Sequence, residues 1–384
     1  MSRLDFSVQE FADRRRCVRR DMQAAGFDWL LVLHPVSIHW LTGSDAKSYQ
    51  AFQCLMVSAA AEHLTLVTRE SERNEFTDDA WVDEIITWGG GEPQDPLEVF
   101  KEAAQARNLR GGRVAMEVPA YYLHPHHYAH LKAWLGAALV NDGTSLVHDL
   151  KMVKSSAELA YIRRAAAIAD QAMARFAGSL REGQSELEAA AEVYHALLSA
   201  GSGLPASTLN LVAGERSAFS HGAPTERRFR EGDFGNIEYG ATCKRYTATL
   251  GRQFCLGEPT PRMRELYDVV RAAGDACMRE MRAGVPAVVP HQASCQVIAQ
   301  AGLDRYRIHT TGYGLAPGFP PSWGEPVNMF GGNTYQLRAG MVLSVEPPVF
   351  IGEEKLGARI IDNVLVTNDG VELLSSFDRG LIVV

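Results

Sequence analysis

The sequence predicts an α+β protein of two domains, the first formed by about residues 1–152 and the second by 153–384. In the first range, short apolar segments alternate with amphipathic helical segments, which favours a mixed or parallel sheet with helices outside it. Near Lys151–Lys154 the pattern changes to long helices, followed by a region rich in short strands. The length of 384 residues also fits about two domains.

Bulk composition narrows the class of protein. Hydrophobic residues make up 46% and charged residues 22% of the chain, as in an ordinary globular protein, and the formal net charge of −8 disfavours non-specific binding to nucleic acid or anionic membrane. The amino-terminal segment lacks the apolar core of a signal peptide, and no stretch approaches the ~18 apolar residues of a membrane span. Six scattered cysteines without a CxxC pair indicate reduced thiols. We therefore expect a cytoplasmic protein that has neither nucleic acid nor membrane as partner.

The first domain begins with helical spacing over residues 8–25, and Gly26 follows as a stop signal. A short proline-started helix should end at Gly43. Two apolar segments around the polar tip AAEH predict a hairpin. The segment GGGEP at 89–93 lacks a phosphate-loop pattern and indicates a turn. Alternating strands and helices complete this half, at 28–33, 54–59, 64–68, 83–88, 95–109, 112–118, 125–136 and 138–142.

The second domain should open with an amphipathic helix capped by Ser156, followed by a second helix that stops at Gly201. One long helix, at about 261–283, is expected between the strand-rich segments. It would be closed by Gly284 and Pro286. Strands are expected within 208–214, 234–257, 341–350 and 358–367.

Five motifs from residue 151 onward occur in an order that resembles the creatinase and aminopeptidase P superfamily. They are KMVKSSAELAYIRRAA at 151–166, the "GD…YG…Y…R.F.LG.P" frame at 232–259, HTTGYG at 309–314, LSVEP at 343–347 and ARIIDNVLVTNDG at 358–370. The resemblance covers nearly the whole chain. It implies an N-terminal creatinase/prolidase-like domain, a C-terminal pita-bread catalytic domain and a homodimer.

In metal-dependent members of this superfamily, two Asp, one His and two Glu hold two ions. The resemblance places those five positions at Glu238, Thr249, Tyr313, Glu346 and Ile361. An isoleucine cannot bind a metal, a phenol is a poor substitute for an imidazole, and a dinuclear site needs bridging carboxylates. We therefore predict no metal centre and no cofactor. A single weakly held ion on the two glutamates is the alternative.

A metal-free branch of the superfamily, which includes creatinase and ectoine hydrolase, opens C–N bonds in small zwitterions. The segments IEYGATCKRYTATLGR and GYGLAPGFPPSWGE are similar to ectoine hydrolase. This resemblance implies a metal-independent hydrolase acting on a C–N bond of a small zwitterionic or cyclic amidine compound. The alternatives are a metal-dependent Xaa-Pro aminopeptidase or dipeptidase, a lyase acting on a sulfonium zwitterion, and a binding module without catalysis.

Two catalytic candidates lie in and before the frame at 232–259. His221 matches the superfamily's active-site histidine, and a neutral imidazole can pass a proton to a leaving nitrogen. Glu238 lies within an apolar strand, where a carboxylate is costly unless it is paired or used. Its expected role is that of nucleophile or of a group that orients water. The alternative is a salt bridge to Lys244 or Arg245 across the turn.

Glu346, in the buried-looking segment SVEPP, is the third catalytic candidate. Together with Glu238 it would form a negative pocket, which suits a cationic substrate or activates a water. The alternative is a structural ion pair with Arg359 or Arg252.

The substrate-binding candidates are mainly aromatic. Aromatic faces attract delocalised cations, although core packing is their commoner role. Tyr49, in a loop of the first domain, is a candidate on the resemblance alone, and Lys47 lies near it in the same loop. The five candidates are Tyr246, Tyr313, Trp323, Thr249 and Tyr49. The pair His126 and His130 is expected on a solvated helix face, since it has no acidic third ligand nearby.

Overall fold

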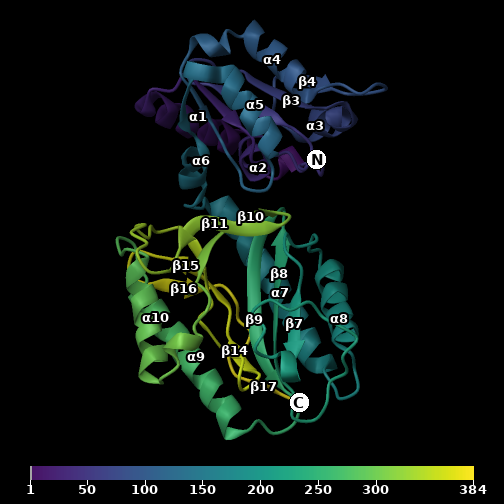
Figure 1. Ribbon diagram of the computed structural model, residues 1–384, viewed down its shortest axis with the longest axis vertical. Coiled ribbons are helices and arrows are strands. Elements are labelled where there is room, and N and C mark those ends of the chain that lie inside the picture. Colours follow the sequence, from purple (N-terminus) through teal and green to yellow (C-terminus); the bar gives the residue numbers. More distant parts are fainter. Residues whose placement is uncertain (1) are drawn as a thin grey trace. The chain divides into compact units, whose positions relative to one another are not determined.

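The computed structural model describes residues 2–384, and the chain divides into two compact units at Lys151/Met152. This division lies one residue from the boundary expected from the sequence. In Figure 1 the first unit runs from purple to blue and the second from teal to yellow.

The first unit is a six-stranded mixed sheet between two layers of helices (Figure 1). The strand order is β4-β3-β2-β1-β5-β6, with β1–β2 and β2–β3 antiparallel and the other pairs parallel. Alternate residues of β1 enter opposite cores: Leu30 and Val32 pack with α1 and α6, and Leu31 packs with α4 and α5. The strands are β1 Trp29–Val32, β2 Cys54–Ser58, β3 Leu64–Arg69, β4 Glu84–Trp88, β5 Val114–Met116 and β6 Leu139–Asp142. The helices are α1 Val8–Ala25, α2 Pro35–Thr42, α3 Arg73–Asp79, α4 Pro96–Ala106, α5 Pro125–Leu135 and α6 Thr144–Lys151.

The predicted elements of this unit are present. Helix α1 ends where Gly26 adopts a left-handed φ of 72°, and α2 begins at a proline and ends at Gly43 with φ 84°. Strands β2 and β3 form the expected antiparallel pair. Both glycines lack the Cβ that makes such backbone angles costly, so local chemistry was enough to predict both helix ends.

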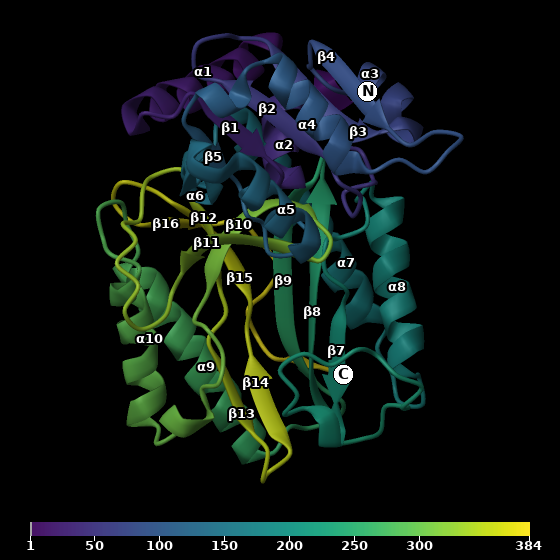
Figure 2. The same cartoon turned by 45° about the horizontal axis from the view of Figure 1, so that its top comes forward.

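The second unit is built on a strongly bent nine-stranded sheet, ordered β16-β15-β12-β10-β9-β8-β7, with β11 on β10 and β17 on β9 (Figure 2). A separate ribbon is formed by β13 and β14. The strands are β7 Asn210–Ala213, β8 Phe234–Cys243, β9 Tyr246–Cys255, β10 Tyr313–Phe319, β11 Ser322–Asn328, β12 Val342–Val345, β13 Pro348–Ile351, β14 Leu356–Arg359, β15 Asp362–Val366, β16 Val371–Leu373 and β17 Ile382–Val383. The helices are α7 Ser156–Ser179, α8 Glu186–Ser199, α9 Pro261–Glu280 and α10 Val288–Gln300.

The hairpin β8–β9 determines where the site lies. Its strands pair over ten residues, with Glu238 opposite Gly251 and Gly240 opposite Thr249. Because side chains alternate along a strand, Glu238 and Gly240 share one face, whereas Tyr239 points to the other. That other face packs against helix α7, where the Tyr239 hydroxyl donates to the Ala169 carbonyl at 2.8 Å. The Glu238 face is therefore turned away from α7.

Two predictions for this unit are wrong in detail. The single helix expected at 261–283 ends at Glu280, and a second helix, α10, follows from Val288. Pro286 and Pro290 resemble breakers in the sequence, but Pro290 lies in the first turn of α10, where a backbone N–H has no intrahelical partner. The cap of α7 is Ser155 rather than Ser156, because Ser155 and Glu158 form a reciprocal capping box.

Candidate active site

Three buried ionisable side chains from separate segments meet on the face of β8 that points away from α7. Glu238 lies within β8, Glu346 follows β12, and Arg359 ends β14; their exposed fractions are 5%, 1% and 2%. His221 and His309 join them from loops. We call these five residues the central cluster. The second unit therefore brings together the three predicted catalytic residues and two further side chains that were not predicted for the site.

Glu238 is held by an ion pair with Arg359. The guanidinium Nη2 contacts Glu238 Oε2, and Asn210 Nδ2 donates to the same oxygen at 3.0 Å. The structural partner considered from the sequence, Lys244 or Arg245, is therefore wrong, because both residues lie at the distant hairpin turn. Both contacts engage Oε2, so Oε1 is the oxygen that can act on a ligand.

Glu346 is the most perturbed acid of the cluster. Burial, and next the charge of Glu238, raise its pKa to about 8, although Arg359 and a hydrogen bond from Ser344 act in the opposite direction. The Ser344 hydroxyl donates to Oε2 at 2.9 Å. Oε1 is buried with no hydrogen-bond partner among the described residues, and it lies 3.6 Å from His309 Nδ1. At neutral pH Glu346 is therefore protonated and can donate a proton.

This protonation corrects the expected negative pocket. At neutral pH the cluster holds one carboxylate, on Glu238, and one guanidinium, on Arg359, which balance each other. Arg252 is not the partner of Glu346, since it pairs with Asp362 at 3.0 Å.

The two histidines face each other, with ring centroids 5.3 Å apart in an edge-to-face arrangement. Burial, and next the Arg359 guanidinium, lower the pKa of both His221 and His309. Both rings are therefore neutral at pH 7 and can accept a proton. His309 was missed as a site residue, although it begins the HTTGYG motif, four residues before Tyr313.

Tyr313 and Trp323 form one wall beside the glutamates. The Trp323 indole Nε1 donates to the Tyr313 hydroxyl at 3.1 Å. Burial, and then the charges of Glu346 and Glu238, raise the pKa of Tyr313, which places its phenol within electrostatic reach of both acids. Thr249 shares the face of Glu238, but its hydroxyl accepts a hydrogen bond from Asn363 Nδ2 at 2.8 Å. These contacts place Tyr313 and Trp323 beside the central cluster. The Thr249 hydroxyl, in contrast, is engaged in a structural hydrogen bond with Asn363.

Tyr246 lies elsewhere than expected. It pairs with Cys243, and therefore projects on the face opposite Glu238. Its fully buried hydroxyl donates to Glu158 at 2.8 Å, and its ring stacks on Tyr161 of helix α7. The predicted substrate contact is corrected to a packing role.

Tyr49 belongs to the first unit, where its ring meets Tyr122 edge to face at 6.1 Å. Its proposed contact with substrate remains a prediction. His126 and His130 are exposed, as expected, with ring centroids 4.2 Å apart on α5.

The five family metal positions do not form a dinuclear donor set. Ile361 is fully buried, and its side chain packs against Gly251, where an added Cβ would lie 2.7 Å from it. The Thr249 hydroxyl is bonded to Asn363 and the Tyr313 hydroxyl to Trp323. Across residues 2–384, no group of three or more His, Cys, Asp or Glu side chains could hold a metal ion. The residues present do not fit two bridged ions.

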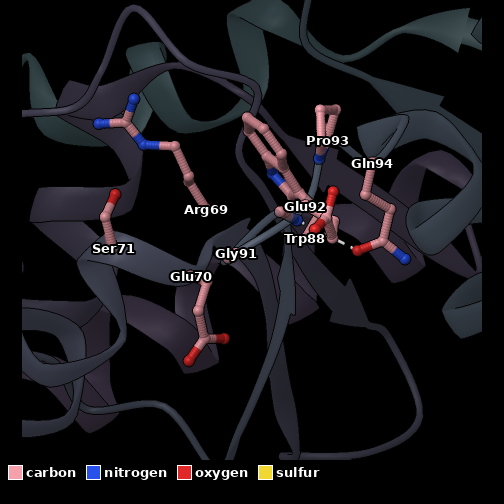
Figure 3. A pocket seen from close by; sticks show the side chains of 10 residues that line it. Arg69, Glu70, Ser71, Trp88, Gly91, Glu92, Pro93 and Gln94 are labelled. Carbon is pink, nitrogen blue, oxygen red and sulfur yellow. Dashed lines mark hydrogen bonds between the residues drawn. The ribbon is translucent and has the colours of Figure 1, made fainter.

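A separate surface pocket of about 640 Å³ lies in the first unit (Figure 3). Trp88 and the glycine-rich turn that begins at Gly89 line it, with Arg69 and Glu70 across from them. Glu70 is bonded to Arg73 at 2.9 Å, and Glu92, the other acid of the lining, is exposed, so the pocket holds no buried acid of the kind found in the central cluster. The turn expected at GGGEP is present, with positive φ at Gly89 and Gly90.

Among the described residues, no helix has the length and apolar character needed to cross a membrane.

Comparisons with known proteins agree with this architecture. Residues 160–368 match metallopeptidase family M24, and residues 14–153 match the creatinase/prolidase N-terminal domain. A Xaa-Pro dipeptidase of Pyrococcus horikoshii is 30% identical over 237 residues, which are 62% of this chain and 66% of the dipeptidase. An ectoine hydrolase of Halomonas elongata is 27% identical over 99% of this chain and 98% of its own. The crystal structure of dipeptidase PepE from Mycobacterium ulcerans superposes with a TM-score of 0.85 at 26% identity, covering 99% of each chain.

The family match covers more than half of the chain, and it agrees with the bent sheet of the second unit. This protein is therefore a two-domain member of the M24 family, with a creatinase/prolidase-like N-terminal domain and a pita-bread catalytic domain.

Proposed function

We propose that this protein is a metal-independent hydrolase that cleaves a C–N bond in a small zwitterionic or cyclic amidine compound of the ectoine type. One observation carries the proposal: two buried glutamates of the central cluster have different surroundings, since one pairs with a guanidinium and the other has no cationic partner of its own. Glu238 is ion-paired with Arg359, whereas Glu346 has a pKa of about 8. Two carboxyl groups whose environments separate them in this way can serve as base or nucleophile and as acid.

The chain's own side chains can supply each proton and electron pair of such a hydrolysis. Glu238 either orients the water whose oxygen bonds to the carbon, or bonds to the carbon through Oε1 itself, in which case a water then cleaves the resulting ester and frees the carboxylate. As the C–N bond breaks, its electron pair stays on nitrogen, which takes the proton of Glu346. A neutral imidazole, His221 or His309, takes the proton that water loses and returns it to Glu346. The sum is addition of one water across the C–N bond.

The similarity to an ectoine hydrolase over nearly the full length supports this substrate class, and the donor set at the family metal positions supports a reaction without metal. The relative at 30% identity, a Xaa-Pro dipeptidase, keeps a metal-dependent peptidase as the second candidate. A lyase acting on a sulfonium zwitterion ranks behind both. A homodimer is proposed on the family resemblance alone, and a cytoplasmic location on the six scattered cysteines without a CxxC pair.

The test is a turnover assay with ectoine, creatine and Ala-Pro, each with added Mn²⁺ and with chelator, followed by amine release. We expect release from ectoine or a close analogue that is equal under both conditions. Glu238→Gln should remove it, whereas Glu353→Gln, at an exposed residue outside the cluster, should not. Hydrolysis of Ala-Pro that depends on Mn²⁺, together with two bound ions per chain by elemental analysis, would reject the proposal.

A further inference from the structure

We infer that Trp323 determines substrate size: its indole closes the Glu238 face of the hairpin toward the β8–β9 turn and limits ligands to about one amino acid there. This inference rests on the proposed function for the location of the reacting bond. It goes beyond it by naming the residue that would separate single-residue zwitterions from dipeptides.

The indole lies directly on the backbone of the catalytic hairpin. A Cβ added to Gly240 would be 2.9 Å from Trp323 Cζ3, and one added to Gly318 would be 3.4 Å from Trp323 Cβ. At Gly240 the ring can lie this close only because the residue has no Cβ, whereas the distance at Gly318 is an ordinary van der Waals contact. Trp323 is 6% exposed, so its ring is packed into the unit rather than projecting from it.

This position is adjacent to the reacting groups. Gly240 is two residues beyond Glu238 on the same face of β8, and Thr249 lies directly opposite it on β9. The strand surface next to Glu238, on the side of the hairpin turn, is therefore covered by the ring. On that side a ligand held at Glu238 has no room for a second residue, which in an extended peptide needs roughly 3.5 Å more.

One hydrogen bond holds the indole itself, and a buried ion pair anchors the strand that carries it. Its Nε1–H donates to the Tyr313 hydroxyl at 3.1 Å. Two residues further along β11, Glu325 forms a buried ion pair with Lys154 at 2.7 Å, and both side chains are almost fully buried. Because the Tyr313 oxygen accepts from Trp323, its own O–H proton is directed away from the indole. This O–H can donate a hydrogen bond to a ligand that lies beside Glu346 and Glu238.

The experiment measures binding rather than turnover, so it stands apart from the test of hydrolysis. Isothermal titration gives dissociation constants for ectoine, proline, Ala-Pro and Ala-Ala-Pro with the wild type, Trp323→Ala and Trp323→Phe. The wild type should bind the one-residue ligands and discriminate against the peptides. Trp323→Ala should improve the ratio of peptide to one-residue affinity at least tenfold, and Trp323→Phe, which keeps most of the ring, should shift it less than threefold.

Trp323 is the only tryptophan of residues 152–384. Ectoine or proline should therefore change the emission of the wild type, and this change should be lost in Trp323→Phe. If Trp323→Ala does not fold, Trp323→Leu replaces it with the same expected direction. The inference is overturned if the wild type binds Ala-Pro as tightly as the one-residue ligands, if the smaller side chain leaves the ratio unchanged, or if none of the four ligands binds any variant.

Discussion

The substitution Glu346→Gln tests the electrostatics of the site without any knowledge of the substrate. Glutamine keeps the size of the side chain and mimics the neutral acid, but it cannot ionise. In the folded protein the pKa of Glu346 is raised from its ordinary 4.5 to about 8, mainly by burial. An unfolded chain ionises the same group near its ordinary pKa.

The sign follows from proton uptake. Between pH 4.5 and about 8 the folded state holds a proton on Glu346 that the unfolded state has lost, so the stabilising contribution of protonation is complete below pH 4.5 and is lost as pH rises. The slope for one proton is ~1.4 kcal/mol per pH unit. Between pH 5 and pH 7.5 the wild type should therefore lose about 3 kcal/mol of unfolding free energy that Glu346→Gln does not lose.

Urea unfolding at pH 5, 6, 7 and 7.5, followed by circular dichroism, measures this difference in the transition of the second unit. Replacing the carboxyl also changes the unfolding free energy by an amount that does not depend on pH. The informative quantity is therefore how the difference in unfolding free energy between wild type and Glu346→Gln changes with pH. Glu353→Gln, at an exposed position, should run parallel to the wild type. If Glu346→Gln also runs parallel to the wild type, Glu346 is not held protonated, and the assignment of the acid is wrong.

Three further outcomes are expected. Arg359→Ala leaves Glu238 buried without its partner and should destabilise the fold by ~3–5 kcal/mol in urea, whereas Arg163→Ala, in an exposed ion pair with Glu372, should cost less than about 1 kcal/mol. The rate of C–N cleavage should fall as pH rises through about 8, because Glu346 loses its proton there. The rate should persist below pH 6.5, because the pKa of His221 and of His309 is lowered. A rate that rises through pH 8 would contradict the role of Glu346 as the acid. Dialysis against a chelator should leave both the melting temperature and the rate unchanged, and a loss restored by Mn²⁺ or Zn²⁺ would show that a metal is required.

The sequence was most informative where the determinants are local. Glycines at helix ends, a proline at the first helical position and the alternation within 232–254 predicted α1, α2 and the hairpin. Alternation also settles the face of Tyr246 once the turn is known to contain two residues. Glu238 then pairs with Gly251, and directly paired residues share a face. Tyr246 lies an odd number of residues from Gly251, so its side chain projects on the face opposite Glu238.

The long-range contacts could not be predicted. Arg359 is 121 residues from Glu238, and their ion pair exists because the ribbon that carries Arg359 packs beside β8. Nothing in the local sequence distinguishes Arg359 from Arg252, which pairs with Asp362 instead. The raised pKa of Glu346 likewise depends on burial by several segments at once, which spacing along the chain does not reveal.

The two-residue turn between β8 and β9 is made of residues poorly suited to it. Lys244 and Arg245 have φ of 53° and 68°, a region that costs side chains other than glycine or asparagine roughly 1 kcal/mol each. Arg245 nevertheless places its guanidinium 4.4 Å from the centre of the Phe319 ring, and its carbonyl accepts from the Gly318 amide at 2.7 Å. An Asn-Gly turn would relax the backbone and release the ring contact that ties the tip to β10. A designer who optimised this hairpin only for stability would thus loosen the strand on which Tyr313 is carried.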